Sequence, residues 1–425
     1  MRRLILPAAL RPRIAGPTLG SAVASGVSAA TTLLVAQGIG AAGFGRFTVV
    51  LSIALIVTVG MLMSLHYVML QELPRAAPED RPALLTTALA ATLVLGSLVA
   101  AAGMLAAPVL TTLLGVDVRT LGFGLALAMS MTLNHLTECV LRGLGRYVRT
   151  AVLKLTVALA YLGGSAYCLL VLGLRDAEVY LTALIATNTA FAVVAVAGSG
   201  ARPRAWRAAL VRPLYRLGGY VTAVAALTGV AFGLDVIFLN HWAAPAEVGV
   251  YSVYNGFPKR LLGVLFTDGV GLALLPAMAT MDKPELLRRI GRLVPAVALG
   301  TAAVAFAASL VFFLLLRAQY PYAVDLMALS AAGIGAHTVF NLYSVTLLMD
   351  GVRGSRLLIA CLGAGTPLVL GLQAALIAGF GLYGGLIAFA LSNAALVVMI
   401  AAAAARAYRA APRAVPDGMP RGPLP

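Results

Sequence analysis

The sequence is poor in charge, in histidine and in cysteine. Only 11% of its 425 residues are charged, whereas a soluble domain carries about 25%, so a single water-soluble globule is excluded. Four histidines and three cysteines are too few for a zinc or haem scaffold, and the cysteines all lie in apolar runs, which leaves no disulfide framework. A GxxxxGK[ST] loop is also missing, so we expect no ATP hydrolysis. We therefore predict no cofactor and no metal site.

Hydrophobic residues are abundant instead. They make up 61% of the chain, and the mean hydropathy is +0.96, which indicates an integral membrane protein. A membrane helix needs about 20 apolar residues, and the strand-like alternation of a membrane barrel is missing. The predicted fold class is therefore all-α, with twelve transmembrane helices. The runs that meet this test are 14–40, 47–70, 83–110, 119–141, 150–174, 178–200, 217–241, 248–275, 293–316, 322–349, 356–379 and 382–405.

Basic residues mark one side of this predicted membrane bundle. They gather at the N-terminus, in the even-numbered connections and in the tail, and the odd-numbered connections hold only Arg46, Arg119, Arg175 and Arg317. Because cytoplasmic loops collect Lys and Arg, both termini should face the cytoplasm. The net charge of +16 is then explained by topology and attraction to membrane lipids, not by binding of nucleic acid. Arginine greatly outnumbers lysine, which favours a G+C-rich genome and a bacterial plasma (inner) membrane.

A short segment recurs after an offset of 204 positions. Residues Ala41–Phe47 match Pro245–Tyr251, with Gly45 on Gly249. The offset crosses six predicted helices, so both halves share one orientation, as in carriers with a pseudo-twofold axis along the membrane normal. The predicted divisions are a cytoplasmic leader, an N-lobe, a basic inter-lobe linker, a C-lobe and a cytoplasmic tail, at residues 1–13, 14–200, 201–216, 217–405 and 406–425 respectively.

The chain resembles the polysaccharide-biosynthesis flippases, which include the O-antigen-type oligosaccharide flippases. The resemblance is carried by a short outer loop at Gly40–Phe47, its echo at Val248–Tyr251, and the segments Leu141–Tyr147 and Leu275–Met278. That family shares a superfamily with the lipid II flippases and the multidrug and toxic compound extrusion carriers. The resemblance implies two six-helix lobes around a central cavity. It also implies transport of a polyprenyl-pyrophosphate-linked glycan by alternating access, without enzyme chemistry.

The eighth predicted helix carries two adjacent cations near its middle, Lys259 and Arg260. Charged side chains at that depth are costly unless they face a cavity or a partner. Ser252, Asn255 and Lys259 share one helical face. Arginine grips two phosphate oxygens at once and lysine adds a point charge, so we interpret this face as a substrate site for a diphosphate. A structural salt bridge between helices is the alternative.

Three further residues are candidates for charge pairing or ion coupling. Asp235, in the seventh predicted helix, lies at a depth close to that of Lys259 and is the expected partner of Lys259. It is also a candidate switch for coupling to H⁺ or Na⁺. Asp268 lies toward the cytoplasmic end of the eighth helix, and His337 lies near the middle of the tenth. A hydrogen bond between helices is the alternative role for His337.

Another polar group lies in the N-terminal half. Glu138 and Arg142 are spaced i, i+4 at the cytoplasmic end of the fourth predicted helix, which predicts a local ion pair. Asn134 and His135 precede them and are equally suited to hydrogen bonding between helices.

Two other functions are alternatives to glycan flipping. A cation-coupled multidrug exporter of the same superfamily should show acidic residues in its cavity, yet 14–40 has none, and the cations of the eighth helix would repel cationic drugs. A polytopic membrane glycosyltransferase or polymerase would need an acid in an outer loop, and the first outer loop offers only Arg46. The sequence therefore favours an anionic lipid-linked substrate.

Overall fold

The computed structural model describes residues 11–256, 258–259, 282–316 and 320–409, and these residues are helical almost throughout. The N-terminal half contains α1 (Arg11–Leu62), α2 (Leu65–Glu72), α3 (Arg81–Leu105), α4 (Ala107–Leu114), α5 (Val118–Gly143), α6 (Tyr147–Leu170) and α7 (Ala177–Ala197). The second half contains α8 (Val211–Gly233), α9 (Asp235–Trp242), α10 (Pro245–Tyr251), α13 (Lys283–Leu316), α14 (Val324–Leu348) and α15 (Val352–Arg409).

Eight helices of the described residues are long and apolar enough to cross a membrane. The count rises to nine if α4 and α5, which meet at 99°, are taken as one bent span. The chain is therefore a multi-pass integral membrane protein of the all-α class. Two of these helices far exceed the roughly 20 residues that one crossing needs: α1 has 52 residues and α15 has 58.

Both long helices contain a sharp break at a glycine. The backbone leaves the helical region at Gly40, where φ is 68° and ψ is 177°, and at Gly381, where φ is 51° and ψ is −126°. Positive φ is accessible to glycine without steric conflict, so each long helix reverses at one residue. The short outer loop predicted at Gly40–Phe47 was therefore wrong: residues 41–47 are helical, and the connection is the Gly40 turn itself.

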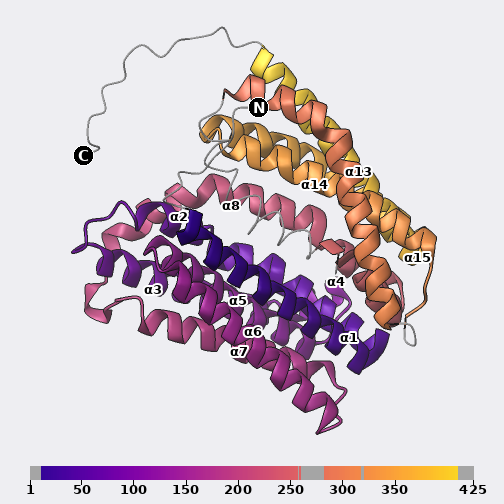
Figure 1. Ribbon diagram of the computed structural model, residues 1–425, viewed down its shortest axis with the longest axis horizontal. Coiled ribbons are helices and arrows are strands. Elements are labelled where there is room, and N and C mark those ends of the chain that lie inside the picture. The colour runs from indigo at the N-terminus through magenta and orange to yellow at the C-terminus, as the bar shows by residue number, and fades with distance from the viewer. Residues whose placement is uncertain (1–10, 257, 260–281, 317–319, 410–425) are drawn as a thin grey trace.

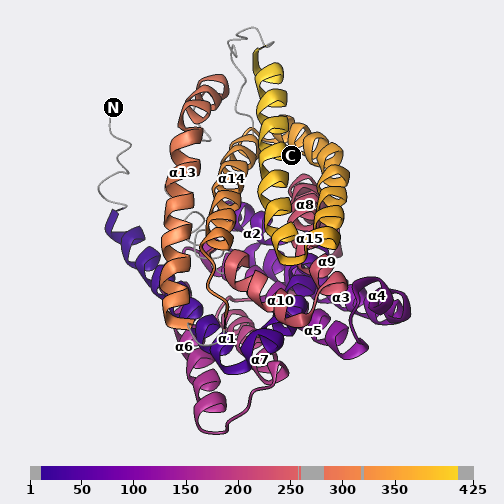
Figure 2. The same ribbon diagram turned by 90° about the vertical axis from the view of Figure 1, so that its right-hand side faces the viewer.

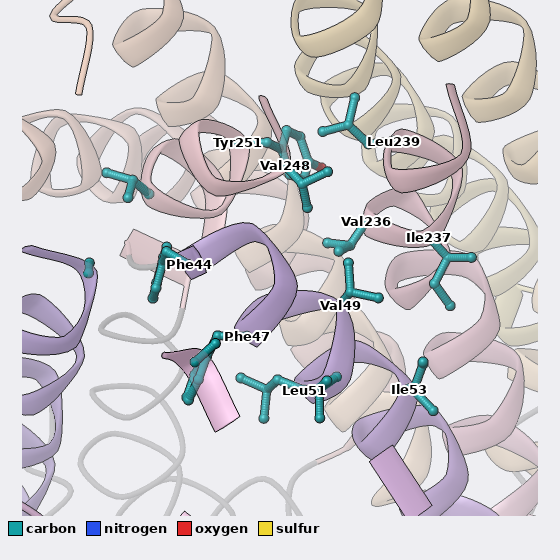
Figure 3. Packing of buried hydrophobic residues seen from close by; sticks show 14 of the residues in the cluster. Phe44, Phe47, Val49, Leu51, Ile53, Val236, Ile237, Leu239, Val248 and Tyr251 are labelled. Atoms are coloured by element: carbon teal, nitrogen blue, oxygen red, sulfur yellow. The ribbon is translucent and has the colours of Figure 1, made fainter. Parts of the chain in front are cut away.

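Two groups of helices make up the molecule (Figure 1). Helices α2, α3, α5, α6 and α7 run beside α1, while α13, α14 and α15 form a second group that diverges from the first. Figure 2 shows α15 as two adjacent rods on either side of its break. The largest apolar cluster joins the groups, and Figure 3 shows Phe44, Val49 and Ile53 of α1 next to Val236 and Val248 of α9 and α10.

The two repeated glycines meet in a reciprocal contact at this junction. A Cβ on Gly45 would lie 2.0 Å from the Pro245 carbonyl oxygen, and a Cβ on Gly249 would lie 1.9 Å from the Ala41 carbonyl oxygen. Ala41 and Pro245 are themselves equivalent positions of the repeat. Small residues permit such close backbone approach between membrane helices. The sequence repeat thus corresponds to a crossing in which each copy packs on the other.

Two further hydrogen bonds connect the halves at the same end. The Asn240 side-chain amide donates to the Gly115 carbonyl at 3.0 Å, and the Tyr320 hydroxyl donates to the Ala36 carbonyl at 3.0 Å. All four residues lie in or beside the predicted outer connections. The segments predicted to lie outside therefore come together at one end of the bundle.

The expected linker at 201–216 is partly ordered against α3. Two short 3₁₀ turns, Pro203–Ala205 and Ala208–Leu210, precede α8, which already begins at Val211. The Thr86 hydroxyl donates to the Arg202 carbonyl at 2.9 Å, and the Thr87 hydroxyl accepts the Arg207 amide at 3.1 Å. Threonine hydroxyls on α3 thus satisfy backbone groups of the connection.

Candidate functional site

The helix predicted at 217–241 is broken in its second half. Helix α8 ends at Gly233 and α9 begins at Asp235, so Leu234 separates them. Carbonyls at the end of a helix lack intrahelical partners, and unsatisfied carbonyls are costly in a membrane. Here side chains from other helices supply the donors: Gln373 Nε2 lies 2.8 Å from the Ala231 oxygen, and Lys259 Nζ lies 3.5 Å from the Phe232 oxygen.

The Lys259 ammonium also lies against aromatic rings. Its Nζ is 4.9 Å from the centroid of the Phe389 ring and 5.9 Å from that of the Phe232 ring. Aromatic faces attract cations, more strongly where water is excluded. Lys259 is partly buried, so its charge is held inside the C-terminal group of helices by rings and a helix-end carbonyl.

His337 lies in the same group of side chains. Its ring packs edge-on against Phe232, with centroids 5.2 Å apart, and Nδ1 is 2.9 Å from Asn393 Oδ1. The residues Phe232, Lys259, His337, Phe340, Phe389 and Asn393 are called the Lys259 cluster below. His337 therefore makes a hydrogen bond between α14 and α15, the role given as the alternative from the sequence.

Asp235 is buried, with 3% of its surface exposed, and forms a separate network. The Tyr251 hydroxyl donates to Asp235 Oδ2 at 2.5 Å, and the Asn255 side-chain amide donates to the same hydroxyl oxygen at 2.7 Å. The Val236 amide donates to Asp235 Oδ1 at 2.8 Å. Among the described residues, Asp235 and Lys259 form no ion pair, so the expected pairing was wrong. Tyr251, and not Lys259, is the partner of Asp235 because Tyr251 lies on α10, which packs directly beside α9.

Ser252 and Asn255 belong to a π-helical turn, Ser252–Gly256, that follows α10. Both side chains are buried. The Ser252 hydroxyl donates to the Val248 carbonyl within the same segment at 2.7 Å, so it is satisfied locally. The shared face predicted for Ser252, Asn255 and Lys259 is interrupted, because a π-helical turn changes the angular spacing of side chains.

Proline explains the position of this turn. Pro258 has no amide hydrogen, so the Tyr254 carbonyl loses its usual helical donor. The Ser330 hydroxyl of α14 takes that place and donates to the Tyr254 oxygen at 2.6 Å. The Tyr254 carbonyl is therefore bound by a neighbouring helix, and this bond connects the turn to α14.

The second predicted cation, Arg260, and the predicted carboxylate Asp268 lie outside the described residues. The geometry of the candidate site consequently rests on Lys259 and its neighbours. Sequence reasoning did not anticipate Gln373, Phe232, Phe389 or Asn393. Gln373 and Asn393 carried a usable signal, since each is an uncharged polar residue inside a long apolar run.

A second polar cluster lies in the N-terminal half. Glu138 Oε1 lies 2.6 Å from an Arg142 nitrogen and 2.9 Å from Lys154 Nζ. The Asn134 amide donates to Asn188 Oδ1 at 2.8 Å, joining α5 to α7. The i, i+4 ion pair is present as predicted, but Lys154 was missed as its third member. Because Glu138 on α5 also pairs with Lys154 on α6, this cluster connects the two helices.

The fold is similar to the folds of solved membrane transporters, two of which are described as members of the MOP superfamily. A multidrug resistance MATE family transporter in an inward-facing conformation matches with a TM-score of 0.70 and 12% identity, covering 91% of this chain and 95% of that one. The lipid II flippase MurJ, in an inward closed conformation, matches with a TM-score of 0.64 and 8% identity over 90% of this chain and 86% of its own.

A third structure is a MOP superfamily transporter from Pyrococcus furiosus, described as having a binding pocket of reverse polarity that suggests a different function. It matches with a TM-score of 0.54 and 14% identity over 93% of this chain and 94% of its own. No protein-family model and no curated protein matches the sequence. The first of these structures is described as a multidrug resistance transporter and the second as a lipid II flippase.

Proposed function

We propose that this protein flips a polyprenyl-pyrophosphate-linked oligosaccharide across the plasma membrane for cell-surface polysaccharide assembly. The proposed mechanism is alternating access between two six-helix lobes, twelve helices in all. The breaks at Gly40 and Gly381 support the larger count, because each divides one long helix into two lengths that can cross a membrane. The reciprocal contact of Gly45 and Gly249 supports a twofold relation between the lobes.

The position of the Lys259 charge is the observation that carries the choice of substrate. A diphosphate that crosses a low-dielectric slab needs fixed positive charge inside the protein. Lys259 supplies that charge from the interior of a helix group, beside rings and a carbonyl instead of at the surface. Arg260, which lies outside the described residues, is the second cation that the sequence suggests for this site.

The breaks in neighbouring segments add support. Discontinuous membrane helices mark substrate sites in many carriers, because their free backbone groups can line a cavity. Here the α8–α9 break and the π-helical turn at Ser252–Gly256 lie side by side, linked through Asp235 and Tyr251. In this proposal Asn255 and Ser252 lie beside the diphosphate site. Asp235 and His337 change the net charge around that site by gaining or losing a proton.

A reconstitution experiment tests the proposal. Proteoliposomes carrying a polyprenyl-diphosphate-linked fluorescent oligosaccharide should show protein-dependent flipping, and Lys259→Gln should lower the rate at least about tenfold, the loss expected for one ionised hydrogen bond. Lys283→Gln is the matched control, because Lys283 begins α13 at the end of the bundle. Flipping by Lys259→Gln at the wild-type rate would overturn the assignment of the site.

A cation-coupled multidrug exporter is the second candidate. It is favoured by the buried Asp235 carboxylate, which is a suitable group for exchanging a proton against a cationic drug. In that case proteoliposomes would accumulate ethidium under a proton gradient, and Asp235→Asn would abolish the uptake. Glycan flipping without ethidium uptake excludes this candidate.

A further inference from the structure

A hollow of about 530 Å³ lies where the two ends of α15 meet. Its walls are Val352, Arg353, Arg356, Leu357, Ala407 and Tyr408. Because α15 reverses at Gly381, its first and last turns lie side by side, and Arg353 donates to the Ala407 carbonyl at 2.8 Å. The volume falls in the range of about 300–1,000 Å³ that is usual for small-molecule sites.

Two exposed arginines on one face of α15 form part of the wall of this hollow. The guanidinium carbon of Arg353 lies 4.7 Å from the Tyr408 ring centroid, and that of Arg356 lies 5.9 Å from the Tyr220 ring centroid. Arg356 also donates to the Tyr220 hydroxyl at 3.3 Å. A guanidinium has five N–H donors, and the described contacts engage one donor in each arginine. The aromatic rings thus hold both groups in place while most donors remain available.

Six other arginines of the described residues have carboxylate partners. Arg75, Arg119, Arg142, Arg207, Arg288 and Arg289 each form an ion pair with Asp or Glu. Within the described ranges, Arg353 and Arg356 form no such pair. The neighbouring Asp350 accepts the hydroxyl of Tyr408. The hollow is therefore lined by two cations that have no ion-pair partner among the described residues, which favours an anionic ligand.

We infer that this hollow binds the phosphodiester of an anionic phospholipid headgroup. One arginine side chain can donate to two phosphate oxygens at once. Basic pockets between helices at the membrane surface bind anionic lipids. The apolar Val352, 51% exposed, and Leu357 lie beside the arginines. That combination suits a phosphate with an attached glycerol and acyl chain better than a free phosphate ion. The site is separate from the Lys259 cluster and does not depend on the proposed function.

Native mass spectrometry of the delipidated, full-length protein tests the inference. With dioleoyl phosphatidylglycerol as probe, the wild type should retain at least one lipid that Arg353→Gln/Arg356→Gln loses, with affinity lowered by about tenfold or more. Dioleoyl phosphatidylcholine should bind equally weakly to both proteins. Arg288→Gln/Arg289→Gln is the matched control, because it removes the same charge from two arginines that are paired with Glu285.

Each outcome of this experiment decides the question. Undiminished phosphatidylglycerol binding by Arg353→Gln/Arg356→Gln, or equal loss in the control, overturns the site. Displacement of the lipid by millimolar inorganic phosphate shows a free-phosphate site and overturns the lipid assignment. If the glutamine variant does not fold, Arg353→Lys/Arg356→Lys decides instead. That variant keeps the charge but loses the paired geometry, so a lowered preference for phosphatidylglycerol supports the inference and an unchanged preference contradicts it.

Discussion

A carboxylate buried among membrane helices needs hydrogen-bond donors, and Asp235 obtains them from Tyr251 and from the Val236 amide. Lys259 has the opposite charge, and the sequence predicts a similar depth in the membrane for it. In the structure, however, its ammonium lies against the rings of Phe232 and Phe389. Depth along two helices does not specify which faces meet. The identity of the Asp235 partner is therefore a property of helix rotation, which residue counting does not supply.

Removing the Tyr251 hydroxyl should destabilise the protein. Tyr251→Phe leaves the buried Asp235 carboxylate without its shortest donor, so the free energy of unfolding should fall by about 1–3 kcal/mol. Tyr383→Phe is the control, since it removes a hydroxyl that donates to the Asp325 carboxylate at 2.6 Å in an exposed position, and its effect should stay within about 0.5 kcal/mol. Denaturant titration in detergent measures both. Equal losses of unfolding free energy in the two variants would show that burial does not strengthen the Tyr251–Asp235 hydrogen bond.

Among the helices, the crossing of α1 and α10 depends most closely on small residues. Gly45 and Gly249 each pack directly on a carbonyl of the other segment. The sequence indicated this relation as a repeat with an offset of 204 positions. It did not indicate that the two copies touch, because a repeat implies equivalence and not contact. The breaks at Gly40 and Gly381 lie at the ends of predicted apolar runs, whereas the break at Leu234 lies inside the run 217–241 and depends on local backbone geometry that hydropathy does not report.

A single methyl group should disturb this crossing. Gly249→Ala places a Cβ 1.9 Å from the Ala41 carbonyl oxygen, so α1 and α10 must separate, at an expected loss of about 1–3 kcal/mol. Gly45→Ala should behave similarly. Gly60→Ala, on α1 with no atom within 4 Å of the added Cβ, should be neutral or slightly stabilising because alanine favours helix. Thermal unfolding in detergent distinguishes them, and equal melting temperatures for Gly249→Ala and Gly60→Ala would refute the close contact.

At the scale of the whole molecule, the predicted outer connections converge. The contacts Gly45–Pro245, Asn240–Gly115 and Tyr320–Ala36 all lie at that end. The basic connections, including the arginines beside the 530 Å³ hollow, belong to the opposite end according to the predicted topology. The bundle is thus joined across its two halves on the side predicted to face outward.

Labelling of single cysteines tests this orientation. In a background with Cys139, Cys168 and Cys361 replaced by alanine, Arg175→Cys should react with a membrane-impermeant maleimide added to intact spheroplasts. Arg204→Cys, an equally exposed arginine in the basic connection before α8, should react only after the membrane is permeabilised. The expectation follows from the concentration of Lys and Arg in cytoplasmic loops. The reverse pattern would invert the topology.

Hydropathy, the repeat and the charge distribution were sufficient to predict a helical membrane protein and the approximate position of most helices, because a bilayer requires about 20 apolar residues per crossing and internally paired backbone groups. Tertiary structure decided the rest: the one-residue reversals at Gly40 and Gly381, the Tyr251–Asp235 bond and the aromatic surroundings of Lys259. The lipid selects for apolar length along each helix. Contacts between helices depend on rotation and depth, which arise only when the helices pack together.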